Sequence, residues 1–274
     1  MNILEQLQQN RWMIWAKEEE PLEEYPQVQL ISICYRSDDC EVRGYAAAPK
    51  EAQGPLPAVI FNRGGNREFS LLRPQVVCKY ANQGFVVLGS QYRGNGGGTG
   101  QEEFGGADVN DVIRLIDIAL ELPETLKGGV YMAGHSRGGM MTYRCCALDD
   151  RIVAASIGAG VADCVDMYNR REDSMKQVFL ELVGGTPEQL PEEYRNARQS
   201  AGRTRSSRRS SSVRATMTGA SIFLRRAGWA SSCKSTARST SWNFLEGRTT
   251  RSKGPAIFQT LSRGFGLTRF RRCN

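Results

Sequence analysis

Short apolar segments alternate with helix-patterned segments between residues 56 and 158, and this alternation constrains the fold more than any other feature. The apolar runs suit strands buried on both faces; they are residues 56–62, 85–90, 129–133 and 151–158. Helix-patterned segments separate them at residues 73–83, 108–122 and 138–147. We expect Asp108 to cap the second of these helices. The alternation predicts an α/β fold with a mostly parallel sheet and helices on both faces.

A hairpin and a polar extension are predicted ahead of this region. Residues 27–36 and 40–49 alternate apolar and polar side chains around Ser37-Asp38-Asp39, which predicts two antiparallel strands. Residues 1–26 form an amino-terminal extension that is too polar and too acidic for a signal peptide. No apolar run approaches the ~18 residues that a membrane span needs, so no membrane interaction is expected.

The cysteine and histidine content argues against a metal site. The eight cysteines include no Cys-x-x-Cys pair, and the single histidine leaves no Cys/His spacing for zinc. We therefore expect no metal and no cofactor. The lack of a signal peptide and of a membrane span predicts a cytoplasmic protein in a reduced state.

The composition changes near Ala197. Residues 197–274 carry 17 Lys and Arg but one acidic residue, Glu246, whereas residues 1–196 carry 19 basic and 28 acidic residues. The apolar periodicity also ends there. We therefore divide the chain into the extension, an α/β domain over 27–196 and a basic Ser/Arg-rich tail over 197–274, which we expect to be disordered. The few aromatic residues of this tail form no stacking platform, so nucleic acid is not an expected partner.

The segment Gly134-His135-Ser136-Arg137-Gly138 has the G-x-S-x-G pattern of a nucleophile elbow and lies between a predicted strand and a predicted helix. In such an elbow the glycines allow a sharp turn that exposes the serine. The backbone N–H of Arg137 would face the oxyanion at the start of the helix. We expect a second oxyanion N–H from Arg63 or Gly64, in the loop after an earlier strand. This pattern predicts a hydrolase that forms an acyl-enzyme on Ser136.

The catalytic base is missing from this pattern. A serine hydroxyl needs a partner that takes its proton, usually an imidazole within hydrogen-bond reach. The one histidine of the chain, His135, adjoins Ser136 on the same tight turn, where neighbouring side chains diverge. Aspartates 149, 150, 163 and 166 have the right type for the acid of a triad, but we expect them to be surface residues. Base and acid are therefore not identified.

The glycine run at residues 94–98 is predicted to be a structural loop. A phosphate-binding loop would require a Gly-Lys-Ser/Thr sequence after the glycines, and none follows here. The dinucleotide-binding spacing G-x-G-x-x-G is also absent, because Thr99 stands where the third glycine belongs.

Several motifs together resemble the catalytic domain of the prolyl oligopeptidase family of serine peptidases. They are Gly134-His135-Ser136-Arg137-Gly138-Gly139, Tyr92-Arg93-Gly94, the segment 104–112 and Pro191-Glu192-Glu193-Tyr194-Arg195. The resemblance extends over about residues 28–196. It implies an α/β-hydrolase fold, a Ser-Asp-His triad in that order, and cleavage of short peptides or related amides and esters. It also implies that the acid and base follow the last strands, within 197–274, where the chain has neither Asp nor His. The sheet is therefore expected to lack its last strands and to end at an exposed edge.

A frameshift would explain this mismatch. Met217-Thr218 is encoded by ATG-ACN, and the frame two nucleotides on contains GAC, an aspartate codon. In that frame the codons of residues 215–221 permit Asp-Asp-Asp-Trp-Arg-Val, and those of 247–252 permit Pro-Asp-His-Ala-Leu. Both resemble the acid and histidine motifs of the family, in the expected order. We hypothesise that a frameshift near Ala197 replaced the carboxy-terminal third, which sequencing the gene would test.

The sequence therefore predicts a serine hydrolase of prolyl oligopeptidase type that has lost its base and acid. Its expected partner is a small peptide or ester substrate. An alternative function is that of a non-catalytic binding protein, a pseudoenzyme that keeps the pocket and uses the basic tail for interactions.

Overall fold

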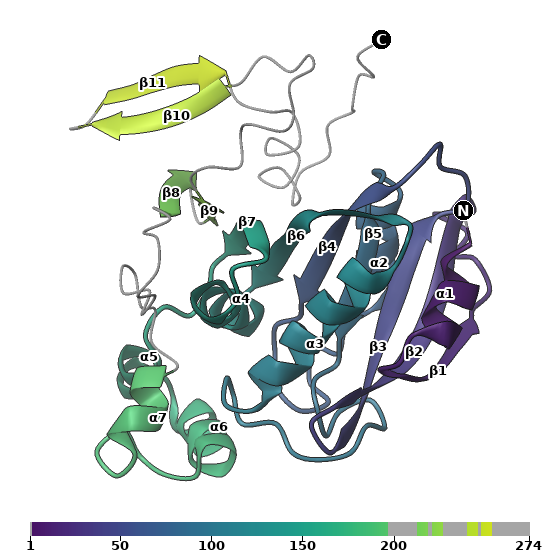
Figure 1. The fold of residues 1–274 in the computed structure, drawn as a ribbon. Coiled ribbons are helices and arrows are strands. Elements are labelled where there is room, and N and C mark those ends of the chain that lie inside the picture. The colour runs from purple at the N-terminus through teal and green to yellow at the C-terminus, as the bar shows by residue number, and fades with distance from the viewer. Residues whose placement is uncertain (1, 197–212, 219–220, 227–239, 246–247, 254–274) are drawn as a thin grey trace.

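A nine-stranded sheet forms the centre of the fold, with strands in the order β1-β2-β3-β5-β4-β6-β7-β9-β8 (Figure 1). The computed structural model describes residues 2–196, 213–218, 221–226, 240–245 and 248–253. Its strands are β1 (Met13–Glu18), β2 (Val28–Ser37), β3 (Cys40–Pro49), β4 (Leu56–Asn62), β5 (Val86–Ser90), β6 (Thr125–His135), β7 (Ile152–Gly158), β8 (Val213–Thr218), β9 (Ser221–Arg226), β10 (Thr240–Leu245) and β11 (Arg248–Lys253). Its helices are α1 (Ile3–Gln9), α2 (Pro74–Ala81), α3 (Asp108–Glu121), α4 (Arg137–Leu148), α5 (Cys164–Arg170), α6 (Asp173–Val183) and α7 (Pro191–Asn196).

The parallel part of the sheet agrees with the sequence prediction. Strands β5, β4, β6 and β7 are parallel neighbours, and α2, α3 and α4 connect them as crossover helices. In a parallel sheet the carboxyl ends of all the strands lie on the same side of the sheet. The loops that follow β4, β5 and β6 therefore lie together at the carboxyl ends of the strands, and the predicted elbow follows β6.

The predicted hairpin is also confirmed. β2 and β3 pair antiparallel over their whole length, from Val28 opposite Pro49 to Ser37 opposite Cys40. The amino-terminal extension adds further structure to this side of the sheet. β1 pairs with β2 as the edge strand, and α1 packs through the buried side chains of Ile3 and Leu7, which are one helical turn apart.

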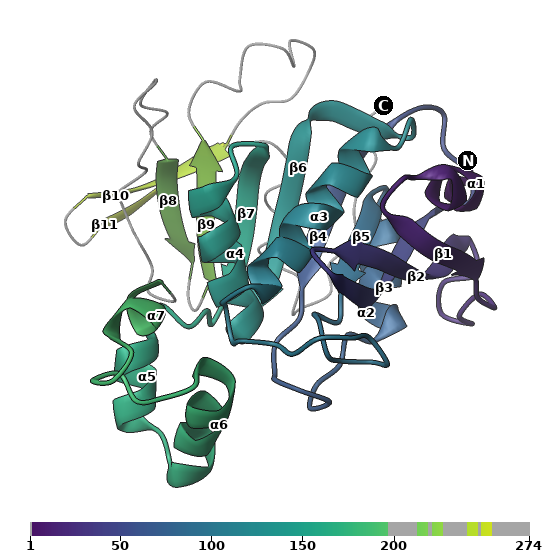
Figure 2. The same ribbon diagram turned by 60° about the horizontal axis from the view of Figure 1, so that its bottom comes forward.

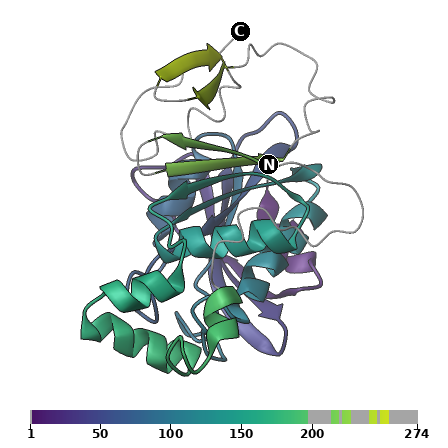
Figure 3. The ribbon, with the colours of Figure 1, turned by 90° about the vertical axis from the view of Figure 1, so that its left-hand side faces the viewer.

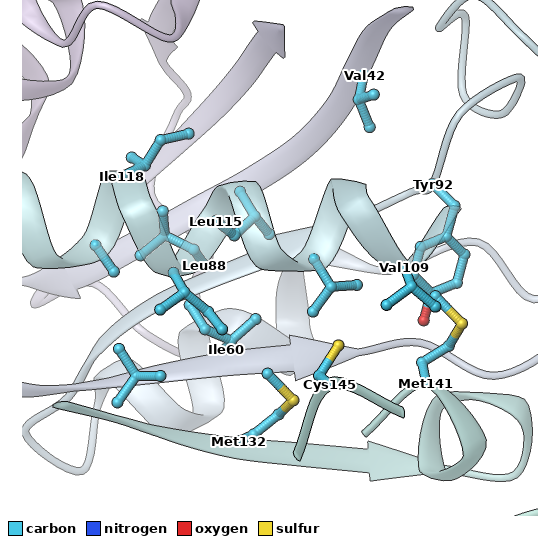
Figure 4. Close-up of a cluster of buried hydrophobic side chains, with 14 of the residues drawn as sticks. Val42, Ile60, Leu88, Tyr92, Val109, Leu115, Ile118, Met132, Met141 and Cys145 are labelled. Carbon is cyan, nitrogen blue, oxygen red and sulfur yellow. The ribbon is translucent and has the colours of Figure 1, made fainter. Parts of the chain in front are cut away.

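Two hydrophobic cores cover the two faces of the sheet, as the alternation predicted. Helices α1, α3 and α4 contribute to one core and α2 to the other. Figure 4 shows the larger core, where Leu115 and Ile118 of α3 lie over Ile60 and Leu88 of the central strands. The apolar stripe of α3 is thereby buried, which explains why its apolar positions recur at helical spacing.

Asp108 does not cap α3. The helix begins at Asp108 itself, and Ala107 holds the N-cap position without a side-chain hydrogen bond. The Asp108 carboxylate instead accepts from the N–H of Gly105 at 2.9 Å and pairs with Arg137. The prediction that Asp108 caps the helix was wrong, because its carboxylate pairs with the buried guanidinium of Arg137 instead.

Three helices follow β7 and form a group beside α4, coloured green in Figures 1 and 3. The local sequence patterns predict no helix or strand over residues 159–190. The start of α5 carries a local signal nonetheless, because the Asp163 side chain accepts from the N–H groups of Val165 and Asp166. α6 ends at Gly184, whose φ of 96° is the left-handed conformation that favours glycine.

The sheet does not end at β7. Among the described residues no parallel strand follows β7, but β9 pairs with it antiparallel and β8 pairs with β9 (Figure 2). The expectation of an exposed edge at β7 was therefore wrong. An unpaired strand presents a row of N–H and C=O groups, and the segment Ile222-Phe223-Leu224 has the composition to pair with it. Within the predicted disordered tail, β10 and β11 also pair antiparallel, and the other tail residues lie outside the described ones.

Within the residues that the structure describes, no helix is long and apolar enough to cross a membrane. The cytoplasmic location stays a prediction.

Candidate active site

Ser136 occupies a strained turn between β6 and α4. Its φ of 56° and ψ of −122° lie outside the regions that a serine normally adopts. Neighbouring backbone holds it there: its N–H donates to the carbonyl of Gly158 at 3.0 Å, and its carbonyl accepts from Gly139 at 2.9 Å and from Val161 at 3.3 Å. The residue is half-buried. The end of β7 and the first turn of α4 thus lock the serine in this conformation.

The glycines of the elbow are required by close backbone contacts. A Cβ atom on Gly134 would lie 2.2 Å from the carbonyl oxygen of Gly138. A Cβ atom on Gly138 would lie 2.0 Å from the carbonyl oxygen of Asn62, the last residue of β4. No side chain fits at either position. The turn at Ser136 therefore packs directly against the end of β4.

The loop after β4 runs beside Ser136. A Cβ atom on Gly64 would lie 3.5 Å from Cβ of Ser136 and 3.1 Å from the carbonyl oxygen of His135. The next residue, Gly65, has a φ of 71° and turns the loop back on Phe69. The structure thus brings Arg63 and Gly64 to Ser136 and Arg137, although 72 residues separate Gly64 from Ser136. These are the residues predicted for the oxyanion hole.

The side chain of Arg63 holds this loop from inside. It is buried and donates to the carbonyl oxygen of Gln91 from Nε at 3.0 Å and from Nη2 at 2.9 Å. It also donates to the carbonyl oxygens of Gly64 at 3.1 Å and Arg67 at 3.0 Å. Burial lowers the pKa of Arg63. The side chain therefore supports the loop and leaves only its backbone to face Ser136.

The side chain of Arg137 is buried as well, next to two acidic residues. It donates to Glu102 at 2.6 Å and also pairs with Asp108, while the rings of Tyr92 and Phe104 lie 4.9 and 4.8 Å from its guanidinium carbon. Burial by itself would lower the pKa of Arg137, but Asp108 and Glu102 outweigh it, so the pKa is raised. Arg137 stays charged and anchors the start of α4.

Glu102 connects the two loops, and sequence reasoning missed it. Besides Arg137, its carboxylate accepts from the backbone N–H of Arg67 and from the Asn95 side chain at 3.0 Å. It also lies 3.7 Å from Arg63. One buried carboxylate thus joins the loop after β4 to the elbow. A glutamate in a polar loop has no local signal for this role, because its partners come from distant parts of the chain.

Asp149, Asp163 and Asp166 make local contacts, and Asp149 is buried rather than at the surface, where it was expected. His135 is exposed and directly precedes Ser136. Asp149 pairs with Arg151 at 2.6 Å, and Asp166 pairs with Arg170 at 2.6 Å. Asp163 caps α5. The described residues also contain no cluster of His, Cys, Asp and Glu that could hold a metal ion.

The glycine run at 94–98 forms a hydrogen-bonded loop. The N–H of Gly94 donates to the carbonyl oxygen of Thr99 at 2.8 Å. The neighbouring Arg93 side chain pairs with Asp111 at 2.7 Å and with Asp38 at 2.8 Å. These contacts fit the predicted structural role.

Comparisons with known proteins identify a family for more than half of the chain. The sequence profile described as the prolyl oligopeptidase family matches residues 67–213, which include Ser136 and Arg137. Over 169 residues the chain is 36% identical to "Uncharacterized peptidase YtmA" of Bacillus subtilis (strain 168), covering 61% of this chain and 65% of that protein. The chain thus spans slightly less than two thirds of that relative.

Solved structures share the fold at lower sequence identity. An acylaminoacyl peptidase of Pyrococcus horikoshii has a TM-score of 0.55 at 20% identity, covering 65% of this chain and 30% of that chain. A puromycin-hydrolyzing peptidase of Mycobacterium tuberculosis has a TM-score of 0.53 at 22% identity, with the same two coverages. An acetyl xylan esterase of Paenibacillus sp. R4 has a TM-score of 0.50 at 18% identity, covering 71% of this chain and 69% of that chain. The fold is that of the α/β-hydrolases.

Proposed function

This chain belongs to the prolyl oligopeptidase family, and on that basis we propose that Ser136 is the nucleophile of a serine hydrolase. The proposed substrates are short peptides or related amides and esters. The observation that carries the proposal is the strained conformation of Ser136 at a turn where Gly134 and Gly138 have no room for a side chain. Strain of this kind persists where the surrounding structure enforces it, and it presents the hydroxyl at the sheet edge.

In the proposed reaction, the Ser136 hydroxyl oxygen attacks the substrate carbonyl carbon and an acyl-enzyme forms as the leaving group departs. The backbone N–H of Arg137, at the start of α4, would stabilise the oxyanion together with an N–H from Arg63 or Gly64. Each such donor contributes on the order of a hundredfold to a thousandfold in rate. Water then hydrolyses the acyl-enzyme. The buried side chains of Arg63 and Arg137 would keep both donors in place.

We further propose that this chain by itself is inactive or very slow. Its one histidine is His135, which adjoins Ser136 on the elbow. Loss of a triad costs about a millionfold in rate, and the oxyanion hole with substrate binding retains on the order of a thousandfold over water. The proton of Ser136 would then have to leave to solvent or to an added base.

A fluorophosphonate probe tests both parts of the proposal. The expected result is slow labelling of the chain that added imidazole accelerates, and no labelling of the Ser136→Ala variant. Fast labelling without imidazole would show that the chain supplies a base and would refute the inactivity. Labelling that survives Ser136→Ala, or no labelling even with imidazole, would refute the nucleophile assignment.

A non-catalytic binding protein is the second candidate function. The observation that favours it is a complete elbow in a chain whose only histidine lies within that elbow. Hydrolysis of an aminoacyl-nitroanilide at the same rate by the chain and by Ser136→Ala, even with imidazole, would favour this alternative. The basic tail that it invokes falls mostly outside the described residues.

A further inference from the structure

A cavity of about 500 Å³ lies between the loop 101–106 and the helices α6 and α7. Its lining combines polar and apolar residues, and the buried ones include Phe104, Cys164, Leu182 and Tyr194. Figures 1 and 2 show that α5–α7 form a group of their own beside α4. The cavity occurs where this group meets the loop 101–106. This volume is in the range of small-molecule sites.

Two aromatic residues line the cavity, Phe104 and Tyr194, and Phe179, which does not line it, packs against both rings. The ring centroids of Phe104 and Phe179 are 4.8 Å apart, and those of Phe179 and Tyr194 are 5.7 Å apart. The Tyr194 hydroxyl donates to the carbonyl oxygen of Gly185 at 3.0 Å, which fixes its ring. Aromatic faces attract organic cations as well as apolar groups.

The charged residues that line the cavity are all acidic. Glu103, Glu181 and Glu193 are exposed at its rim, and the described lining residues include neither Lys nor Arg. Glu181 pairs with Arg67 of the loop after β4. Arg144 lies behind the wall, where it donates to the carbonyl oxygen of Gly105. Glu103 accepts from the backbone N–H of Ala107 at 2.7 Å through Oε2, and Glu193 is close enough to Arg144 for their charges to interact. The carboxylates left for a cationic ligand are therefore Glu103, through its other oxygen, and Glu193.

The cavity adjoins the elbow through Met140. The Sγ atom of Cys164 lies 3.4 Å from Sδ of Met140, and a Cβ atom on Gly105 would lie 2.8 Å from Cε of the same residue. The backbone N–H of Met140 donates to the carbonyl oxygen of Ser136 at 3.4 Å. Ser136 itself does not line the cavity, but a wall of the cavity rests on the first turn of the helix that begins after it.

We propose that this cavity binds the first residue of a peptide, with its apolar side chain against Phe104 and Tyr194 and its free ammonium group between Glu103 and Glu193. An apolar body with an ammonium group matches a site that combines aromatic faces with carboxylates and has no competing cation in its lining. As a substrate subsite it rests on the proposed function. The binding itself does not depend on catalysis.

Calorimetric titration of the full chain with leucyl-leucinamide tests this proposal, with N-acetyl-leucyl-leucinamide as the matched ligand that lacks the charge. We expect the free-amine peptide to bind with a Kd on the order of 1 mM and the acetylated peptide to bind at least about tenfold more weakly. Nα-acetyl-lysine amide, which presents its ammonium on a side chain, should bind no better than the acetylated dipeptide. Equal binding of the two dipeptides, no binding of either, or tighter binding of the lysine derivative would overturn the proposal.

Two variants on α7 separate a local contact from general charge attraction. Glu193→Gln removes a carboxylate at the cavity, whereas Glu192→Gln makes the same change on the adjacent residue, which does not line it. We expect Glu193→Gln to weaken binding of the free-amine peptide about tenfold and Glu192→Gln to weaken it less than about twofold. Equal effects of the two variants would refute the site.

The Ser136→Ala variant distinguishes a failure of this inference from a failure of the proposed function. It should bind the peptide as the unmodified chain does, because Ser136 does not line the cavity. If the unmodified chain binds the peptide but the probe does not label it, the nucleophile assignment is refuted and the cavity site is kept. Labelling of Ser136 without peptide binding would refute the cavity site and keep the nucleophile.

Discussion

Replacing Arg137 by Met is expected to destabilise the protein strongly. Arg137 is 1% exposed, and Asp108 and Glu102, whose carboxylates it meets, are 0% and 3% exposed. Removing one member of a buried ion pair costs about 3–5 kcal/mol, because the remaining charge stays buried without a partner. A Met side chain preserves most of the apolar contact with Tyr92 and Phe104, so the loss should come mainly from the charges. That loss is a large share of a typical stability of about 5–15 kcal/mol.

Urea unfolding followed by circular dichroism measures this effect. Arg11→Met is the matched control, because Arg11 pairs with Glu121 at 2.7 Å with 70% of its side chain exposed, and its loss should cost at most about 1 kcal/mol. The double variant Arg137→Met/Asp108→Asn should be about 1–2 kcal/mol more stable than the sum of its single variants, since it leaves one charge fewer without a partner. Equal costs at Arg137 and Arg11, or an additive double variant, would refute this reasoning.

Three further predictions concern the elbow, the alkaline limit of stability and the core. Gly138→Ala should abolish probe labelling and lower the free energy of unfolding by about 3 kcal/mol or more. The reason is that its Cβ would lie 2.0 Å from the carbonyl oxygen of Asn62. Unchanged labelling would contradict the geometry of the turn. Burial raises the pKa of Tyr80 from 10.0 to about 12 and that of Cys164 from 9.0 to about 12, so the folded state keeps these protons longer than the unfolded chain does. Stability should therefore stay level below about pH 9 and fall from there towards pH 12, and stability that rises over this range would contradict the assigned burial. Leu115→Ala, in the core under α3, should cost about 2–5 kcal/mol in the same unfolding assay, and a loss under about 1 kcal/mol would show that this core is not tightly packed.

Local signals in the sequence were sufficient for the strands and helices between residues 27 and 158. The β2–β3 hairpin followed from alternation, and the parallel strands β4–β7 followed from apolar runs separated by helices. Each of these patterns repeats within a few residues, so neighbouring positions carry enough information. The helices α5 and α6 were missed although Val178, Phe179 and Leu182 show helical spacing in α6.

The turn at Ser136 also follows from a local sequence pattern, whereas the residues that surround it come from distant parts of the chain. Local patterns predict the α/β order and the turn at Ser136, and the chain contains no second histidine. The folded structure was needed to show that Gly64 lies against the serine, that Glu102 joins Arg63 to Arg137, and that α6 and α7 close a cavity over Phe104. Turn geometry depends on the conformational freedom of a few adjacent residues, but the partner of a buried charge or the far wall of a cavity is set by which distant segments the folded sheet brings together.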